Sequence, residues 1–242
     1  MPTTPPRVLI SDELSPAAVQ IFKDAGVAVD FKPGLSKEEL DKIIGQYDGL
    51  AIRSATKVTE KLIAKAEKLR VVGRAGIGVD NVDIKAATAR GIIVMNTPFG
   101  NSITTAEHAI SLMLALARQI PAADRSTQAG KWEKSKFMGV EITGKVLGVL
   151  GCGNIGSIVA DRGVGLRMKV IAYDPYLSPE RAVELGVEKV ELDDLLRRSD
   201  FITLHTPLTD KTRNIIDAAA LEKTKPGVRL INCARGGLVD EV

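Results

Sequence analysis

Three glycines in the middle of the chain are spaced as in turns that hold a phosphate. Gly151, Gly153 and Gly156 follow the pattern G-x-G-x-x-G, directly after the apolar run Val146–Leu150 and before a helical pattern that extends to about Arg167. In such a turn the first glycine permits a tight bend, the second lets the backbone approach a pyrophosphate, and the third allows the helix to pack closely on the strand. The amides at the start of the helix then face the phosphates, so the pattern predicts a dinucleotide site.

An acidic residue follows this turn at the distance that ribose recognition requires. The next expected strand, Met168–Tyr173, ends before Asp174, which lies 18 positions after Gly156. The carboxylate that accepts a hydrogen bond from the ribose 2′-hydroxyl typically lies roughly 20 positions after the glycine motif. Pro175 and Tyr176 offer no positive charge to a 2′-phosphate, so we expect NAD rather than NADP. A chance glycine turn is the alternative, and the strand, helix and acid in register argue against it.

Two arginines in the first half stand where strands are expected to end. Arg53 and Ser54 close the third expected strand, and Arg74, Ala75 and Gly76 close the fourth. Ligands of open α/β sheets bind outside the carboxyl ends of the strands, and paired guanidiniums suit a carboxylate or phosphate. The pair beside a glycine-rich loop therefore predicts an anion clamp. The alternative is two solvated charges at strand ends.

Two later strands are expected to end at the same edge as the glycine turn. They span Phe201–Thr206 and Val228–Cys233, and parallel strands present their carboxyl ends on one side of a sheet. The residues at these ends are His205, Thr206, Pro207, Cys233, Ala234 and Arg235. Arg235 is thus a third arginine at such an edge. His108 lies on a helix beside Glu107 without a partner in the sequence, and we interpret it as structural.

Short β-branched runs alternate with helical patterns along the chain, which predicts an α/β fold made of two doubly wound parallel sheets. Gly26 and Gly91 are expected to end helices. In the first half the expected strands are Arg7–Ser11, Val27–Phe31, Gly49–Arg53, Arg70–Arg74 and Ile92–Asn96, and the expected helices are Pro16–Ala25, Lys37–Ile44, Glu60–Lys68 and Ile84–Arg90. In the second half the segments Val183–Lys189 and Leu192–Arg198 continue the alternation, and Ala218–Lys223 is an expected helix.

The stretch from Thr97 to Asn101 interrupts this pattern and is the expected hinge between two domains. A long helix follows, in which Thr104 and Glu107 fit a capping box. Its buried stripe is expected to consist of Ile103, Ala106, Ile110, Met113 and Ala117. After a short helix at Pro121–Gly130, the basic segment Lys131–Phe137 carries the only tryptophan. This segment suits an oligomer contact or an arm reaching a neighbouring subunit, and a solvated loop is the alternative.

Composition excludes several classes of function. With 45% hydrophobic and 26% charged residues and a net charge of +3, the chain resembles a globular protein without a nucleic-acid partner. No apolar run approaches membrane-spanning length and the N-terminus lacks the features of a signal peptide, so we expect no membrane association and a cytoplasmic location. Cys152 and Cys233 lack metal-site spacing and are expected to be reduced residues, neither disulfide-bonded nor metal-bound.

Taken together, these residues resemble the D-isomer-specific 2-hydroxyacid dehydrogenases over essentially the whole chain. The resemblance rests on the runs Arg53–Thr56, Gly73–Asp83, Gly151–Gly156, Tyr173–Pro175, His205–Leu208 and Asn232–Gly237. It implies a flavodoxin-like substrate-binding domain at residues 1–98 and a Rossmann NAD-binding domain at 99–242, each incomplete relative to the family. It also implies a homodimer or homotetramer and a small anionic substrate, 3-phosphoglycerate, oxidised with NAD.

The resemblance further implies roles for individual residues. Arg235 is similar to the catalytic arginine that orients the substrate's carboxylate and carbonyl. Lys134 is similar to a basic residue lent by a partner subunit, and Ile77 stands where some relatives place a threonine against the cofactor. Arg53, Ser54, Arg74, Ala75 and Gly76 correspond to the substrate clamp, and Asn154, Ile155, Asp174, Thr206, Cys233 and Ala234 to positions that line NAD.

One expected element of the family is not matched. The acid/base histidine and its glutamate partner come later in the family's sequence than Arg235, and neither His108 nor His205 corresponds to them. We therefore expect this chain to bind NAD but to turn over poorly. Two alternatives stay open: a glyoxylate or hydroxypyruvate reductase of the same family, and an NAD-sensing interaction module without catalysis.

Overall fold

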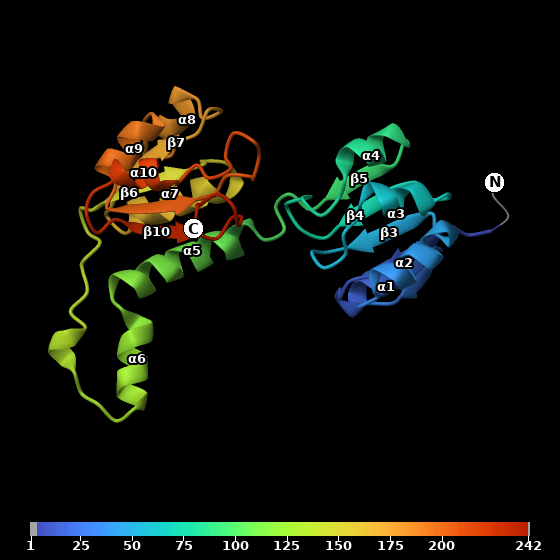
Figure 1. Ribbon diagram of the computed structural model, residues 1–242, viewed down its shortest axis with the longest axis horizontal. Helices are drawn as coiled ribbons and strands as arrows, with labels where there is room; N and C mark the ends of the chain where they lie inside the picture. Colours follow the sequence, from blue (N-terminus) through green and yellow to red (C-terminus); the bar gives the residue numbers. More distant parts are fainter. Residues whose placement is uncertain (1–3, 242) are drawn as a thin grey trace. The chain divides into compact units, whose positions relative to one another are not determined.

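A computed structural model describes residues 4–241 and divides the chain into two compact units, Met1–Asn101 and Ser102–Val242. The division lies at the end of the expected hinge. Each unit is a five-stranded parallel sheet covered by helices, as the sequence predicts (Figure 1). Among residues 4–241, none of the helices combines the length and apolarity that crossing a membrane requires.

The first unit has the strand order β2-β1-β3-β4-β5, which is the flavodoxin-like order. Its strands are β1 (Arg7–Ile10), β2 (Ala28–Phe31), β3 (Gly49–Ile52), β4 (Val71–Arg74) and β5 (Ile93–Asn96). Its helices are α1 (Pro16–Asp24), α2 (Lys37–Ile43), the 3-10 turn η1 (Ile44–Gln46), α3 (Glu60–Lys65) and α4 (Ile84–Ala89). Gly26 and Gly91, with φ of 73° and 69°, follow α1 and α4 as expected.

The first unit has a hydrophobic core on each face of its sheet, because successive side chains along a strand point to opposite faces. Leu9 and Leu50 face a cluster under α2, α3 and α4 that includes the buried Tyr47. Val8, Ile10 and Ala51 face the opposite side, against partly buried residues of α1. Because both faces of the central strands are buried, β3 is an unbroken apolar run.

The second unit has the strand order β10-β9-β6-β7-β8, the Rossmann order read from its other edge. Its strands are β6 (Val146–Leu150), β7 (Lys169–Tyr173), β8 (Glu188–Lys189), β9 (Phe201–Leu204) and β10 (Arg229–Asn232). Its helices are α5 (Ser102–Ala117), α6 (Ile120–Gln128), the 3-10 turn η2 (Lys134–Lys136), α7 (Asn154–Gly165), α8 (Pro179–Glu184), α9 (Leu192–Arg198) and α10 (Ala218–Glu222).

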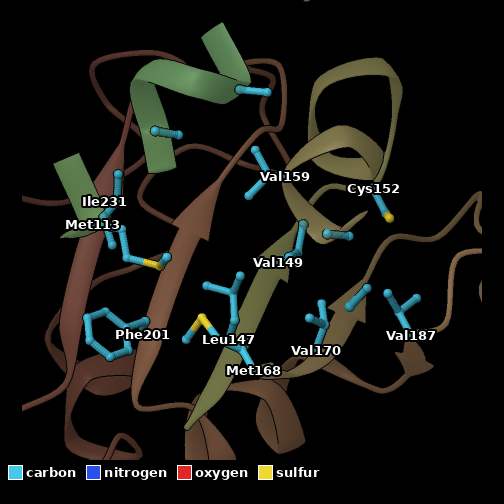
Figure 2. Packing of buried hydrophobic residues seen from close by; sticks show 14 of the residues in the cluster. Met113, Leu147, Val149, Cys152, Val159, Met168, Val170, Val187, Phe201 and Ile231 are labelled. Atoms are coloured by element: carbon cyan, nitrogen blue, oxygen red, sulfur yellow. The ribbon is translucent and has the colours of Figure 1, made fainter. Parts of the chain in front are cut away.

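One face of this second sheet carries the core that Figure 2 shows. There Leu147 and Val149 of β6 belong to one cluster with Phe201 of β9, Ile231 of β10 and Met113 of α5. The opposite face holds Leu150 with the buried leucines of α9. Glycine at position 148 is required for this second contact, since a Cβ there would overlap the Ser199 hydroxyl and lie 2.8 Å from Leu195. The sheet thus buries both faces of β6, the strand that delivers the glycine turn.

The expectations for α5 were partly wrong. The helix begins at Ser102, so Thr104 and Glu107 lie inside it and form no capping box. Ala106, Met113 and Ala117 are buried as expected, and Ile110 packs partly buried against the same core. Ile103 is 59% exposed, and Ser102 and Ala109 complete the buried stripe. Small residues in the stripe let α5 approach α7 and β10 closely.

Other differences lie at element ends. The segment Val183–Lys189 is divided: α8 starts earlier, at Pro179 with Ser178 as its N-cap, and Glu188–Lys189 is a short edge strand. The strands β9 and β10 end at Leu204 and Asn232, before the polar residues that were assigned to them. These residues therefore occupy the loops at the carboxyl edge of the sheet.

Candidate functional site

The glycine turn of the second unit has the geometry that a dinucleotide requires. Gly151 has φ of 92° and packs where a Cβ would lie 2.8 Å from Thr206 Cγ2. At Gly156 a Cβ would overlap the carbonyl oxygen of Gly151, so only glycine lets α7 start this close to the turn. Gly153, the N-cap of α7, is exposed, and a Cβ there would meet no protein atom within 4 Å. The protein itself does not require glycine at 153, and the space in front of the helix there is open.

The first turn of the twelve-residue helix α7 lies at this open space. Asn154 and Ile155 are its first residues, and the early amides of a helix have no intrahelical acceptor. They carry the positive end of the helix dipole, which favours a phosphate. The residues present therefore fit a pyrophosphate group.

Asp174 lies beside the turn, at the carboxyl end of β7. Its Oδ2 accepts the backbone N–H of Cys152 at 2.8 Å, and its Oδ1 accepts that of Tyr176 at 2.8 Å. The carboxylate is thereby held in place with lone pairs left over for a further donor. Burial, and secondly the charge of Asp174, raises the pKa of the Cys152 thiol to about 11, so this cysteine stays a neutral packing residue.

The loop after β9 contains two buried polar atoms without partners among the described residues. These atoms are His205 Nδ1 and Thr206 Oγ1. The other ring nitrogen of His205 lies 2.9 Å from the Thr203 hydroxyl. Burial lowers the pKa of His205 to about 4, so its ring is neutral near pH 7. Pro207 follows, exposed, in the same loop. Orphaned polar atoms beside Gly151 are consistent with contacts that a ligand would complete.

Arg235 is held in a turn after β10. Asn232 accepts the Ala234 N–H at 3.0 Å and donates to the Arg235 carbonyl at 2.8 Å, while Arg235 Nη1 donates to the Ala234 carbonyl at 2.8 Å. Burial raises the pKa of the neighbouring Cys233 thiol. Cys233, Ala234 and Arg235 thus sit at the same carboxyl edge of the sheet as the glycine turn, as the strand pattern predicts. Both cysteines are free.

The first unit brings Arg53 and Arg74 together at the ends of adjacent strands. Arg74 Nε donates to the main-chain carbonyl of Arg53 at 3.3 Å. The guanidinium of Arg74 lies over Gly76, where any Cβ would overlap it. Ser54 and Ala75 are exposed in the same two loops, and Ala75 N–H donates to Ile52 O at 2.8 Å. This part of the unit concentrates positive charge and backbone amides, which suits an anion.

Two residues that the sequence did not single out organise this loop. Asp12 accepts several donors of the segment 53–56, and Asn81 donates to its carbonyl groups. Asp12 belongs to no motif of the sequence, where it is an acid in the loop after β1. Its burial, 5% exposed, was the missing signal, and it emerges only in the fold.

Three further residues lie apart from these clusters. Ile77 belongs to the first unit, and its carbonyl accepts from Asn96 Nδ2 at 2.7 Å. Lys134 is exposed in η2, beyond α6, which has no buried residue and extends away from the sheet of its own unit (Figure 1). His108 is exposed on α5. The expected roles of Ile77 and Lys134 stay predictions.

Fold and site together define a class: an α/β protein with a Rossmann unit whose glycine turn and acid suit a dinucleotide. A family model described as the NAD binding domain of D-isomer specific 2-hydroxyacid dehydrogenases matches residues 110–242. The chain belongs to this family, and its second unit carries the family's NAD-binding domain.

Known proteins similar to this chain include a D-3-phosphoglycerate dehydrogenase of Archaeoglobus fulgidus, 51% identical over 97% of this chain and 45% of that protein. The chain thus spans about half the length of the curated relatives it matches. Among solved structures, a glyoxylate reductase from Paecilomyes thermophila has a TM-score of 0.90 at 31% identity, covering 100% of this chain and 76% of the other. A D-lactate dehydrogenase from Aquifex aeolicus, complexed with NAD and lactic acid, has a TM-score of 0.85 at 28% identity, covering 97% and 70%.

Proposed function

We propose that this chain forms the substrate- and NAD-binding part of a dehydrogenase that oxidises 3-phosphoglycerate to 3-phosphohydroxypyruvate, the first step of serine biosynthesis. The observation that carries the proposal is the pair Arg53 and Arg74, joined through the Arg53 carbonyl at 3.3 Å. The 51% identity to a protein named D-3-phosphoglycerate dehydrogenase supports the same substrate. On this proposal residues 1–98 are the substrate-binding domain and 99–242 the NAD-binding domain.

On this proposal the three arginines at the strand ends bind the substrate. Arg53 and Arg74, with the amides of Ser54, Ala75 and Gly76, bind the phosphate or carboxylate of the substrate. Arg235 holds the carboxylate and polarises the carbonyl that forms at C2. These contacts align the C2–H bond and make departure of the hydroxyl proton easier.

The cofactor site is assigned in the same way. The first turn of α7, with Gly151, Gly153 and Gly156, would hold the pyrophosphate, and Asp174 would accept the 2′-hydroxyl of the adenosine ribose. The remaining cofactor contacts are proposed for Asn154, Ile155, His205, Thr206, Pro207, Cys233, Ala234 and Ile77. When bound, NAD accepts the hydride from C2.

A substrate without phosphate is the second candidate, because a glyoxylate reductase shares the fold at a TM-score of 0.90. A titration of this chain with 3-phosphoglycerate and, separately, with D-glycerate, followed by NMR, separates the two. We expect 3-phosphoglycerate to bind at least about tenfold more tightly, since the phosphate adds charge-assisted hydrogen bonds. Equal affinities would remove the phosphate role of the arginines and favour the second candidate.

We also propose that the protein is a homodimer or homotetramer in which Lys134 reaches a neighbouring subunit's site. The support is a set of exposed apolar side chains in the second unit: Trp132 is 84% exposed, Met138 75% and Ile120 52%. Aromatic residues and methionine are enriched in protein interfaces relative to the rest of the surface. Light scattering of the chain, with Trp132→Ser as the comparison, tests this, and a monomeric parent chain would contradict it.

The two free cysteines support a reducing location, which we propose is the cytoplasm.

A further inference from the structure

The side chain of Asp12 is buried against the loop that carries Arg53. It is 5% exposed in the loop just after β1. Its carboxylate oxygens accept hydrogen bonds from residues that lie 41 to 44 positions later in the chain. Oδ2 accepts the backbone N–H groups of Arg53 at 2.6 Å and Ala55 at 3.2 Å, and Oδ1 accepts that of Thr56 at 3.0 Å. The Thr56 hydroxyl also donates to Oδ1. One carboxylate thus satisfies four donors of a single loop.

Asn81 holds the carbonyl groups of the same loop. Its Nδ2 donates to Arg53 O at 2.8 Å and to Thr56 O at 2.6 Å. The Arg53 carbonyl is also the acceptor for Arg74 Nε at 3.3 Å. The main chain at Arg53 is therefore fixed through its N–H by Asp12 and through its C=O by Asn81, and Arg74 is oriented by that same carbonyl.

The hydrogen bonds of Asp12 and Asn81 reduce two costs of binding an anion at this loop. Arg53 and Arg74 bring two positive charges to the ends of adjacent strands, and a loop of exposed residues loses conformational freedom when it is ordered. A buried negative charge that accepts only from this loop lowers the electrostatic penalty and orders the amides in advance. Preorganisation of this kind increases affinity by removing a cost of binding.

We propose that Asp12, together with Asn81, is a positioning residue for the substrate: it sets the Arg53–Thr56 loop so that both guanidiniums meet one phosphate. The inference rests on the proposed function for its substrate, and on the hydrogen bonds above for the loop. Neither side chain is assigned any contact with substrate.

The test compares Asp12→Ala, Asp12→Asn and Asn81→Ala in the 242-residue chain. Asp48→Ala is the matched control, because Asp48 accepts the Arg7 N–H at 2.8 Å across 41 residues at the opposite edge of the same sheet. We expect Asp12→Ala to weaken 3-phosphoglycerate binding by about 10- to 100-fold, the scale for a small misplacement of a positioning group. Asp12→Asn should recover much of this, because its amide oxygen can still accept from the backbone and its NH₂ can donate to Thr56 Oγ1.

Four readouts separate positioning from general destabilisation. Amide hydrogen exchange of Arg53, Ala55 and Thr56 should be faster in Asp12→Ala and Asn81→Ala, and unchanged in Asp48→Ala. Affinity for D-glycerate should fall less than affinity for 3-phosphoglycerate. NAD affinity, a property of the second unit, should stay within about twofold of the parent in every variant, which shows that this unit is folded. Slow amide exchange of the β3 residues Leu50 and Ile52, retained in every variant, shows that the first unit is folded as well.

Each result decides one question. If Asp12→Ala and Asn81→Ala leave loop exchange and 3-phosphoglycerate binding as in the parent, the positioning role is overturned. Losses equal to those of Asp48→Ala would overturn it as well. If the parent chain itself does not bind 3-phosphoglycerate while exchange of the loop responds as expected, the proposed substrate fails and the structural role of Asp12 stands.

Discussion

The carboxylate of Asp174 accepts the backbone N–H of Cys152 at 2.8 Å, which ties the acid at the end of β7 to the glycine turn at the end of β6. The two groups that would recognise ribose and pyrophosphate are therefore held by each other. Burial, and secondly the charge of Asp174, raises the pKa of the Cys152 thiol to about 11, so the thiol stays protonated. A change at Asp174 consequently acts on cofactor choice and on the turn together.

Asp174→Asn tests cofactor choice. The amide keeps one acceptor oxygen for the turn but removes the charge that would repel a 2′-phosphate. We expect NAD affinity to fall by about 1.5–3 kcal/mol, the scale of a hydrogen bond to a charged group, and the preference over NADP to shrink. Calorimetry with both cofactors measures this. Asp161→Asn on α7, whose ion pair is with the exposed neighbour Arg162, is the control and should change neither affinity.

Gly153→Ala and Gly156→Ala form a matched pair. At Gly156 the added Cβ would overlap the Gly151 carbonyl, so we expect a loss of about 1–3 kcal/mol of folding stability, as for overpacking. At Gly153 the Cβ meets no protein atom within 4 Å, so the melting temperature should barely change while NAD affinity falls. Thermal unfolding and calorimetry together give the result. An unimpaired NAD affinity in Gly153→Ala would exclude the space before α7 as the pyrophosphate site.

Arg53→Met and Arg74→Met test the anion clamp. Each should lose about 2–5 kcal/mol of 3-phosphoglycerate binding, the scale for truncating one partner of a buried charge pair, and lose less with D-glycerate. Arg70→Met, at an exposed arginine just before β4, provides the control. NMR titration measures all three. Equal losses for both ligands would assign the arginines to the carboxylate and not to the phosphate.

His205 makes stability depend on acid pH. Its pKa falls by burial from 6.5 to about 4 in the folded protein, so the unfolded chain binds the extra proton first as pH decreases. The contribution of the neutral ring to stability is complete above pH 6.5 and is lost progressively toward pH 4, on the order of 3 kcal/mol. Denaturant unfolding of the parent and His205→Gln between these pH values measures it. His108→Gln, at an exposed position, should keep the slope, and a slope unchanged by His205→Gln would contradict the assignment.

Neither histidine fits the role of catalytic base. His205 is half-buried, with Nε2 2.9 Å from the Thr203 hydroxyl and a ring that is neutral near pH 7, and His108 is exposed on α5. We therefore expect the chain to bind NAD but to form NADH from 3-phosphoglycerate about 10²- to 10⁴-fold more slowly than the similar D-3-phosphoglycerate dehydrogenase of Archaeoglobus fulgidus, the usual contribution of a general base. Single-turnover absorbance measures the rate. A rate equal to that of the relative, abolished by His205→Gln or His108→Gln, would show that the base is one of these two.

Local patterns along the sequence were sufficient to predict those parts of this protein that form from residues close together in the chain. The spacing of Gly151, Gly153 and Gly156, the strand before them and Asp174 after the next strand predict the Rossmann unit, because turn, helix and strand form from contiguous residues. The alternation of apolar runs predicts two parallel sheets for the same reason. Parallel sheets in turn predict that Arg53 and Arg74 lie at one edge, since strands of equal direction end on the same side.

Only the tertiary structure decided which polar residues are buried and what they hold. Asp12 is an ordinary acid in a loop until β1 pairs with β3 and brings it against residues 53–56. The buried stripe of α5 is set by contact with β10 and α7, so Ile103 lies outside it although its spacing fits. The strand β9 ends at Leu204, and in the following loop His205 Nδ1 and Thr206 Oγ1 are buried without a partner in the described part of the chain. These properties arise from long-range packing and desolvation, which depend on residues far apart in the sequence.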